Sequence, residues 1–288
     1  MLAGAFISAF SGALSKVLAE YMSAMEIVFF RNLIGLFLIL YALKHTPPKL
    51  TGGKLHLLIT RGLFGFSAMI LFFYTITTIP LGEAITLNKT SPFFVTLLAF
   101  YLLGEKLTLS TMLALIIGFV GVVMIVKPMG MSVSYEHFLG VLGGFFAAAA
   151  YATIKKIKDI YDTRVIMLSF VTVGTLFPLF FLSVAPYFTP PKAVAFLFPE
   201  FSYSYTLNVW LLIILMAVIA TLSQWLLTKA YSASKLGIIG VVSYTNIPFA
   251  IGFGYMLGDP FPDGLTFVGI GLIVLGGFLV SRTKKEQK

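Results

Sequence analysis

Long apolar runs separated by short polar breaks constrain the fold of this chain more than any other feature. The hydrocarbon core of a bilayer is about 30 Å thick, so a helix that crosses it needs roughly 20 apolar residues. Ten runs of about this length occupy most of the 288 residues. They lie at 2–19, 26–43, 57–79, 84–103, 109–127, 137–156, 163–185, 208–230, 236–257 and 264–281. The pattern predicts an all-α integral membrane protein with ten transmembrane helices.

The composition agrees with this prediction. Hydrophobic residues make up 59% of the chain and charged residues 11%, whereas soluble domains have about 45–50% and 25%. Ten spans with short loops leave no room for a soluble catalytic domain. The chain has no cysteine, which excludes disulfides and thiolate metal sites. We expect no cofactor, no metal and no nucleic-acid partner; the expected partners are membrane lipid and a small-molecule solute.

The distribution of basic residues predicts the orientation, because cytoplasmic loops carry an excess of Lys and Arg. With a cytoplasmic N-terminus, the outer loops hold only Lys127 and Lys192. The inner loops and tail then hold fifteen basic residues: Lys44, Lys49, Lys54, Arg61, Lys106, Lys155, Lys156, Lys158, Arg164, Lys229, Lys235, Arg282, Lys284, Lys285 and Lys288. Both termini are therefore expected in the cytoplasm, which requires an even number of spans. The expected location is the bacterial inner (plasma) membrane.

The two halves of the chain resemble each other. Pro92 in the fourth apolar run and Pro248 in the ninth are each followed, 29 residues later, by a glycine, Gly121 or Gly277. Matched spacing of this kind indicates an internal repeat. The alternative is that two apolar segments look alike by chance.

The repeat predicts two five-helix units, 1–130 and 131–288. Because five is odd, the second unit would enter the membrane from the opposite side, so the repeats would be inverted. Inverted repeats are typical of secondary transporters, in which the two halves exchange conformations. Glycines also predict that spans five and ten pack closely, since small residues let helices approach; they are Gly118, Gly121, Gly269 and Gly276.

Several motifs resemble the EamA family of the drug/metabolite transporter superfamily. They are Arg31-Asn32-Leu33-Ile34-Gly35, Arg61-Gly62-Leu63-Phe64-Gly65, Pro80-Leu81-Gly82-Glu83-Ala84, Ser91-Pro92 and Leu103-Gly104-Glu105-Lys106-Leu107. The second half departs from the pattern, with Asp259-Pro260 where a Gly-Glu-basic run is usual and no counterpart of Arg31. The resemblance implies a ten-helix bundle with a central cavity lined by spans one to four and six to nine. It places spans five and ten at the periphery, often at a dimer contact, so a homodimer is one expected partner.

Three cations lie inside the predicted spans, away from their cytoplasmic ends: Lys16, Arg31 and Lys89. Ionisable groups at such depth usually face a cavity or a partner. One interpretation is a basic cluster that binds an anionic group, with Arg31 in bidentate contact. The alternative is that each cation reaches the outer interface or pairs with an acid, for which the candidates are Glu20, Glu26 and Glu83.

Polar and aromatic residues from both halves complete the predicted binding site. The predicted substrate-binding residues are Arg31, Asn88, Lys89, Ser91, Tyr74, Tyr151, Gln224, Trp225, Tyr244 and Asn246. Pro92 and Pro248 are predicted hinges, because proline removes a backbone donor and frees a carbonyl one turn earlier. The alternative for both prolines is a kink that serves packing alone.

These features predict a secondary transporter that moves a small anionic or zwitterionic metabolite, such as an amino acid or a nucleotide-like compound, by alternating access. Known members move amino acids, nucleotide-like cofactors and other metabolites, which the resemblance extends to this chain. We expect no enzymatic activity. The alternatives are a membrane-embedded enzyme or lipid-modifying protein, which would need clustered catalytic acids and histidines, and a passive channel.

Overall fold

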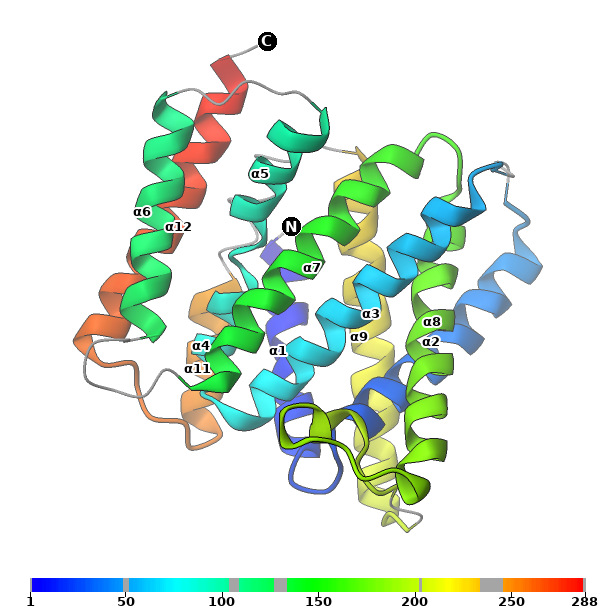
Figure 1. Cartoon of the computed structure of the whole chain (residues 1–288). Coiled ribbons are helices and arrows are strands. Elements are labelled where there is room, and N and C mark those ends of the chain that lie inside the picture. Colours follow the sequence, from blue (N-terminus) through cyan, green and yellow to red (C-terminus); the bar gives the residue numbers. More distant parts are fainter. Residues whose placement is uncertain are drawn as a thin grey trace.

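The computed structural model describes residues 2–48, 52–103, 109–126, 134–201, 204–233 and 246–286. Helices dominate these residues, and they contain no strand. The helices form a bundle, with connecting loops gathered at its two ends (Figure 1). The α-helices are α1 Leu2–Leu18, α2 Ala24–His45, α3 Leu55–Thr78, α4 Leu81–Asn88, α5 Ser91–Leu103, α6 Leu109–Val126, α7 Tyr135–Ile157, α8 Thr163–Val184, α9 Leu207–Ala233, α11 Asn246–Met256 and α12 Gly264–Glu286. Two 3-10 helices, η1 Ala185–Tyr187 and η2 Lys192–Leu197, lie between α8 and α9.

Five of these helices, α2, α3, α7, α8 and α9, are long and apolar enough to cross a membrane. Shorter apolar stretches occur in α1, α6 and α12. The chain is therefore all-helical in the part that the structure describes, with several apolar helices of spanning length. The count of ten spans and the inversion of the two halves stay predictions.

Local sequence signals explain where helices begin. At the start of α2, Ser23 and Glu26 form a capping box: the Ser23 hydroxyl accepts from the Glu26 backbone N–H at 3.3 Å, and the Glu26 carboxylate accepts from the Ser23 N–H at 2.8 Å. Such reciprocal bonds satisfy backbone donors that have no partner within the helix. Asp162 caps α8 by accepting from the backbone N–H of Arg164 at 2.9 Å.

The fourth apolar run is broken in its middle. Helix α4 ends at Asn88, and α5 begins at Ser91, immediately before Pro92. Lys89 and Thr90 lie between them, and the backbone N–H of Thr90 donates to the carbonyl of Leu87 at 3.1 Å. Because proline cannot donate a backbone hydrogen bond, the ladder is interrupted where the sequence predicts a freed carbonyl.

Helices α6 and α12 pack against each other through glycines. A Cβ added at Gly121 would lie 2.6 Å from the carbonyl oxygen of Gly269, and one at Gly276 would lie 2.7 Å from the carbonyl oxygen of Ala114. Both distances are shorter than a real Cβ contact, so only glycine permits this approach. The predicted close packing of these two segments is confirmed. Figure 1 shows the pair set to one side of the bundle.

Candidate functional site

A cavity of about 140 Å³ lies between the helices. One buried water needs only about 10–15 Å³, so the cavity has room for a small polar solute. Helices α1, α2, α3, α4, α7, α8, α9 and α11 contribute to its wall. These helices overlap predicted spans one to four and six to nine, whereas no described residue of α6 or α12 lines the wall.

Three cations reach this wall: Arg31 from α2, Arg61 from α3, and Lys89 from the break after α4. No Asp or Glu is among the described residues that line the cavity. Arg31 and Lys89 were predicted to come together, and the structure places both at one cavity. The arrangement can bind an anionic group, since none of the described residues places an acid in the wall beside these cations.

The side chain of Arg31 contacts a methionine sulfur and two aromatic rings. Its Nη1 donates to the Met69 sulfur at 2.8 Å and to the Asn32 side-chain oxygen at 3.3 Å. Its guanidinium carbon lies 5.8 Å from the ring centre of Phe73 and 5.7 Å from that of Phe170. Glu26, the acid considered as its partner, instead accepts hydrogen bonds from Ser23 and Tyr205. The alternative of an Arg31–Glu26 pair is therefore not what the structure contains.

Arg61 corrects the sequence interpretation. We counted it among the cytoplasmic loop residues, but it is the seventh residue of α3 and is 2% exposed. Its guanidinium carbon lies 4.9 Å from the ring centre of Phe170. The error arose because Arg61 is close in sequence to a loop, and a side chain of its length reaches several ångströms along the bundle. The signal that could have revealed it is Gly65, one turn later, whose missing side chain makes room for the guanidinium.

The break between α4 and α5 also borders the cavity. Asn88 and Lys89 both line it, and Lys89 is partly buried. Gly144 of α7 packs directly against the break: a Cβ there would lie 3.3 Å from the carbonyl oxygen of Asn88 and 2.4 Å from the hydroxyl of Thr90. A close helix backbone therefore covers one side of the interruption, while Asn88 and Lys89 face the cavity on the other.

Helices of the second half supply uncharged polar groups. Tyr151, Gln224 and Asn246, which are among the predicted substrate-binding residues, line the cavity, and Ser223 joins them. The Asn246 side-chain oxygen is buried and has no hydrogen-bond partner among the described residues. Ser8 and Ser11 of α1 are further lining residues that sequence reasoning missed. The wall thus combines cations from the first half with neutral donors and acceptors from the second.

Three predicted residues lie outside the cavity wall. Tyr74 stacks on Phe196 of η2, with ring centroids 4.3 Å apart. Trp225 is 37% exposed and packs its ring under the Lys229 ammonium at 4.9 Å. Ser91 is buried at the first turn of α5. Tyr74 and Trp225 lie on the faces of α3 and α9 opposite to the residues that line the cavity. Helix periodicity separates the faces of a helix, but it does not say which face borders a cavity.

The remaining predicted positions concern the hinges and one tyrosine. Tyr244 lies outside the residues that the structure describes. Pro92 is the second residue of α5, directly after the break. Pro248 is the third residue of α11 and is exposed, and it is not among the lining residues. Hinge motion at either proline stays a prediction.

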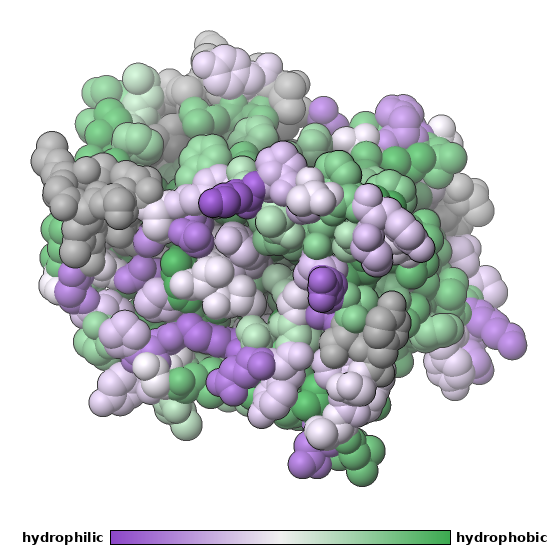
Figure 2. Space-filling model, turned by 60° about the horizontal axis from the view of Figure 1, so that its bottom comes forward, coloured by the Kyte–Doolittle hydropathy of each residue, from purple (hydrophilic) through white to green (hydrophobic). Residues whose placement is uncertain are grey.

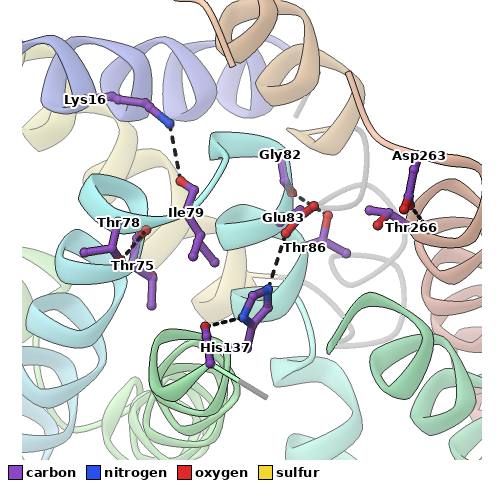
Figure 3. Close-up of polar contacts among 11 residues, drawn as sticks. Lys16, Thr75, Thr78, Ile79, Gly82, Glu83, Thr86, His137, Asp263 and Thr266 are labelled. Carbon is purple, nitrogen blue, oxygen red and sulfur yellow. Dashed lines mark hydrogen bonds and ion pairs between the residues drawn. The ribbon is translucent and has the colours of Figure 1, made fainter. Parts of the chain in front are cut away.

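Two contacts between polar side chains join separate segments at the lower end of the bundle in Figure 1. Lys16 Nζ lies 2.5 Å from Asp259 Oδ1 and also donates to the carbonyl of Ile79 at 3.3 Å. His137 Nε2 lies 3.4 Å from Glu83 Oε2, and Figure 3 shows this pair beside the turn that Lys16 reaches. The expected acids for Lys16 did not include Asp259. Figure 2 shows hydrophilic residues gathered across the middle of this end.

Comparison with known proteins identifies the family. The model of the EamA-like transporter family matches residues 1–127. The pseudopaline exporter CntI of Pseudomonas aeruginosa is 34% identical over 275 residues, which cover 95% of this chain and 91% of that protein. The chain belongs to the EamA-like transporter family. It is therefore a multi-pass membrane transporter, and the names of family and relatives indicate transport rather than enzymatic activity.

Other EamA-like relatives agree. An uncharacterized transporter of Helicobacter pylori is 34% identical over 280 residues, covering 93% of this chain and 89% of that protein. A riboflavin transporter of Vibrio cholerae is 24% identical over 212 residues, covering 73% of this chain and 66% of that protein. A solved crystal structure matches 99% of the chain and 97% of its own with a TM-score of 0.63. Its 17% identity supports the fold alone.

Proposed function

We propose that this EamA-like protein is a secondary transporter for a small anionic or zwitterionic metabolite, such as an amino acid or a nucleotide-like compound. One observation carries the proposal: Arg31, Arg61 and Lys89 line a single cavity whose described wall has no carboxylate. A cation removed from water is costly unless an opposite charge compensates it. An anionic group of the solute would supply that charge while it is bound.

The proposed topology is ten spans in two inverted units, 1–130 and 131–288, with both termini in the cytoplasm of a bacterium and the spans in its inner membrane. The family model ends at residue 127, which supports a boundary near 130. Helix α1 begins and α12 ends in the upper half of Figure 1, which supports termini on one side. Without Arg61, fourteen basic residues still belong to the predicted inner loops and tail.

Alternating access is supported by contacts between the two proposed units. At the lower end of the bundle, Lys16 meets Asp259, Glu83 meets His137, and Glu26 accepts from Tyr205 at 2.6 Å. Each pair joins the first unit to the second. Opening this end of the cavity would separate them, and closing it would restore them, as two alternating states require. The break before Pro92 offers a place for the change in backbone angle.

The names of relatives support the transport of a solute of metabolite size. One relative is named as an exporter of pseudopaline and another as a transporter of riboflavin. Lipid or a second copy of the chain would cover the exposed apolar side chains of α6 and α12, such as Phe119 and Phe267. A homodimer through these helices belongs to the proposal.

Transport by reconstituted protein tests the proposal. A thermal-shift screen of the purified chain against metabolites selects anionic candidates, whose flux and counterflow are then measured in proteoliposomes. Arg31→Gln and Lys89→Gln should each lower the flux at least about tenfold, because a charged hydrogen bond contributes about 1.5–3 kcal/mol. Lys156→Gln, at an exposed position, is the matched control and should transport normally.

Two outcomes would contradict the proposal. Wild-type flux through both cavity variants would remove the cations from the binding site. Flux of the candidate anions without counterflow would indicate a passive channel, because only a carrier that exchanges its solute across the membrane is stimulated by solute on the far side.

A further inference from the structure

A second guanidinium in the cavity bears on the class of solute. We propose that the transported solute carries two separated anionic groups joined by a short apolar linker, with one group bound by Arg31 and the other by Arg61. The linker would lie against the ring of Phe170. This inference rests on the proposed function and specifies the substrate of the same cavity.

Two of the three guanidinium nitrogens of Arg61 are buried without a hydrogen-bond partner among the described residues. They are Nε and Nη1, and the residue as a whole is 2% exposed. The face of Phe170 attracts the guanidinium but accepts none of its hydrogen bonds in the usual geometry. Buried donors without acceptors destabilise a protein, because they lose their hydrogen bonds to water and gain none in return. A side chain kept under these conditions is better explained by a ligand than by folding.

The surroundings of Arg61 are shaped to keep it there. A Cβ added at Gly65 would lie 2.2 Å from Arg61 Nη1 and 2.5 Å from Phe170 Cδ2. A Cβ added at Gly62 would lie 2.8 Å from the carbonyl oxygen of Ser169. The two glycines therefore let α3 approach α8 closely and leave the guanidinium space beside the ring. The small residues around Arg61 therefore accommodate its guanidinium.

The ring of Phe170 lies close to both arginines. The ring centre lies 4.9 Å from the guanidinium carbon of Arg61 and 5.7 Å from that of Arg31. Arg31 is the eighth residue of α2 and Arg61 the seventh residue of α3, and the two helices run in opposite directions (Figure 1). With a rise of about 1.5 Å per residue, the two residues therefore start from opposite halves of the bundle. An apolar surface between two cations matches a molecule with an apolar middle and an anion at each end.

Each arginine can make the contact that this proposal needs. A guanidinium binds a carboxylate through two parallel N–H···O bonds, which adds geometric selectivity to charge attraction. A solute with only one anionic group would leave the second guanidinium without its partner. Binding should therefore depend on the number of anionic groups and on the distance between them.

Paired ligands of nearly equal size test this dependence. Affinities of the purified full chain are measured by calorimetry for succinate, glutarate and adipate, and for the half-amide of each. The half-amides replace one carboxylate by a neutral group of the same shape. Wild-type protein should bind its best dicarboxylate at least about tenfold more tightly than the matching half-amide.

The Arg61→Gln variant tests whether Arg61 binds the second anionic group of the solute. This variant should bind the dicarboxylate and its half-amide with affinities within about twofold of each other, while the half-amide affinity stays at the wild-type value. Lys156→Gln should keep the wild-type preference. If Arg61→Gln weakens both ligands equally, the two arginines share a single anion, and the proposal is overturned.

Thermal melting separates this role from a structural one. Arg61→Met places a side chain of similar length and no charge beside Phe170. The ligand-free variant should melt at a higher temperature than wild type, because donors without partners are removed while packing is retained. A lower melting temperature together with an unchanged dicarboxylate preference would make Arg61 structural and would refute the inference.

The outcomes for the two proposals differ. If wild-type protein binds and transports carboxylates but does not distinguish diacids from half-amides, the anion transporter stands and the dianionic solute is refuted. If it neither binds these carboxylates nor moves any anion in proteoliposomes, the proposed function fails, and the inference fails with it.

Discussion

The cavity and the lower end of the bundle treat charge in opposite ways. At the lower end, Lys16 lies against Asp259, and His137 lies near Glu83. In the cavity, Arg31 and Arg61 lie against the ring of Phe170. The difference teaches that partial burial of a cation does not by itself reveal its role. A paired cation holds helix ends together, whereas a cation without an acid is available to a ligand.

The opposite end of the bundle also contains an ion pair, as the lower end does. Arg164 contacts Asp162 at 3.0 Å and donates to the carbonyl of Thr46 at 2.6 Å, which connects the start of α8 to the end of α2. Lys16 near one end and Arg164 near the other therefore each have an acidic partner. Only in the middle, where a solute would be held, do cations line a wall without an acid among the described residues.

The largest expected effect comes from adding an acid to the cavity wall, where the described residues include none. Gln224→Glu changes the charge of a lining residue with almost no change in size. The new carboxylate should compete with an anionic solute for the cavity cations and lower its flux by about 100-fold, equivalent to about 2–3 kcal/mol. Flux of the anionic hit in proteoliposomes measures the effect.

Gln224→Met is the control for this change, since it removes the amide without adding charge. It should lower the flux much less than the glutamate does. Equal flux in wild type and Gln224→Glu would show that the cations do not hold the solute, and the comparison between the two regions would lose its functional meaning.

The next effect concerns stability at the lower end. Asp259→Asn removes the charge that faces Lys16 and weakens the acceptor for the Leu81 backbone N–H, which lies 2.9 Å from Asp259 Oδ2. We expect a loss of about 2 kcal/mol in the free energy of unfolding, because a partly buried cation loses its counter-charge. Thermal melting in detergent measures the loss.

Removing both partners provides the check. Lys16→Met combined with Asp259→Asn should recover part of the lost stability, since no cation is then left without an acid. Should Asp259→Asn melt like wild type, the ion pair would be unimportant for the closed lower end.

The smallest effect is expected at the cap of α8. The Arg164 side chain, through its hydrogen bond, lowers the pKa of Asp162. The carboxylate therefore contributes stability that is complete above its unfolded pKa, near 3.9, and is lost as the pH falls through the lower folded value. Asp162→Asn keeps a capping oxygen and should cost only about 0.5 kcal/mol at pH 7.

Melting temperatures between pH 5 and pH 3 check this assignment. The difference between wild type and Asp162→Asn should shrink as the pH falls. A difference that is independent of pH would assign the effect to the cap and not to the charge.

The sequence by itself determined the helical membrane class and the family, and it singled out several of the residues that line the cavity. Apolar runs of spanning length produce a surface that is suited to lipid and not to water. A proline within such a run predicts a break in the helix. For these reasons Arg31, Asn88 and Lys89 could be predicted from local spacing. The close packing at Gly121 could be predicted in the same way.

Only the tertiary structure decided which side chains meet. Asp259 is separated from Lys16 by 243 positions, and no local pattern links them. Arg61 looks like a loop cation until α3 and α8 are packed around Phe170, and Trp225 looks like a cavity residue until α9 is given its rotation. Helix periodicity specifies that a helix has faces, but the neighbours of each face are set by packing between distant segments.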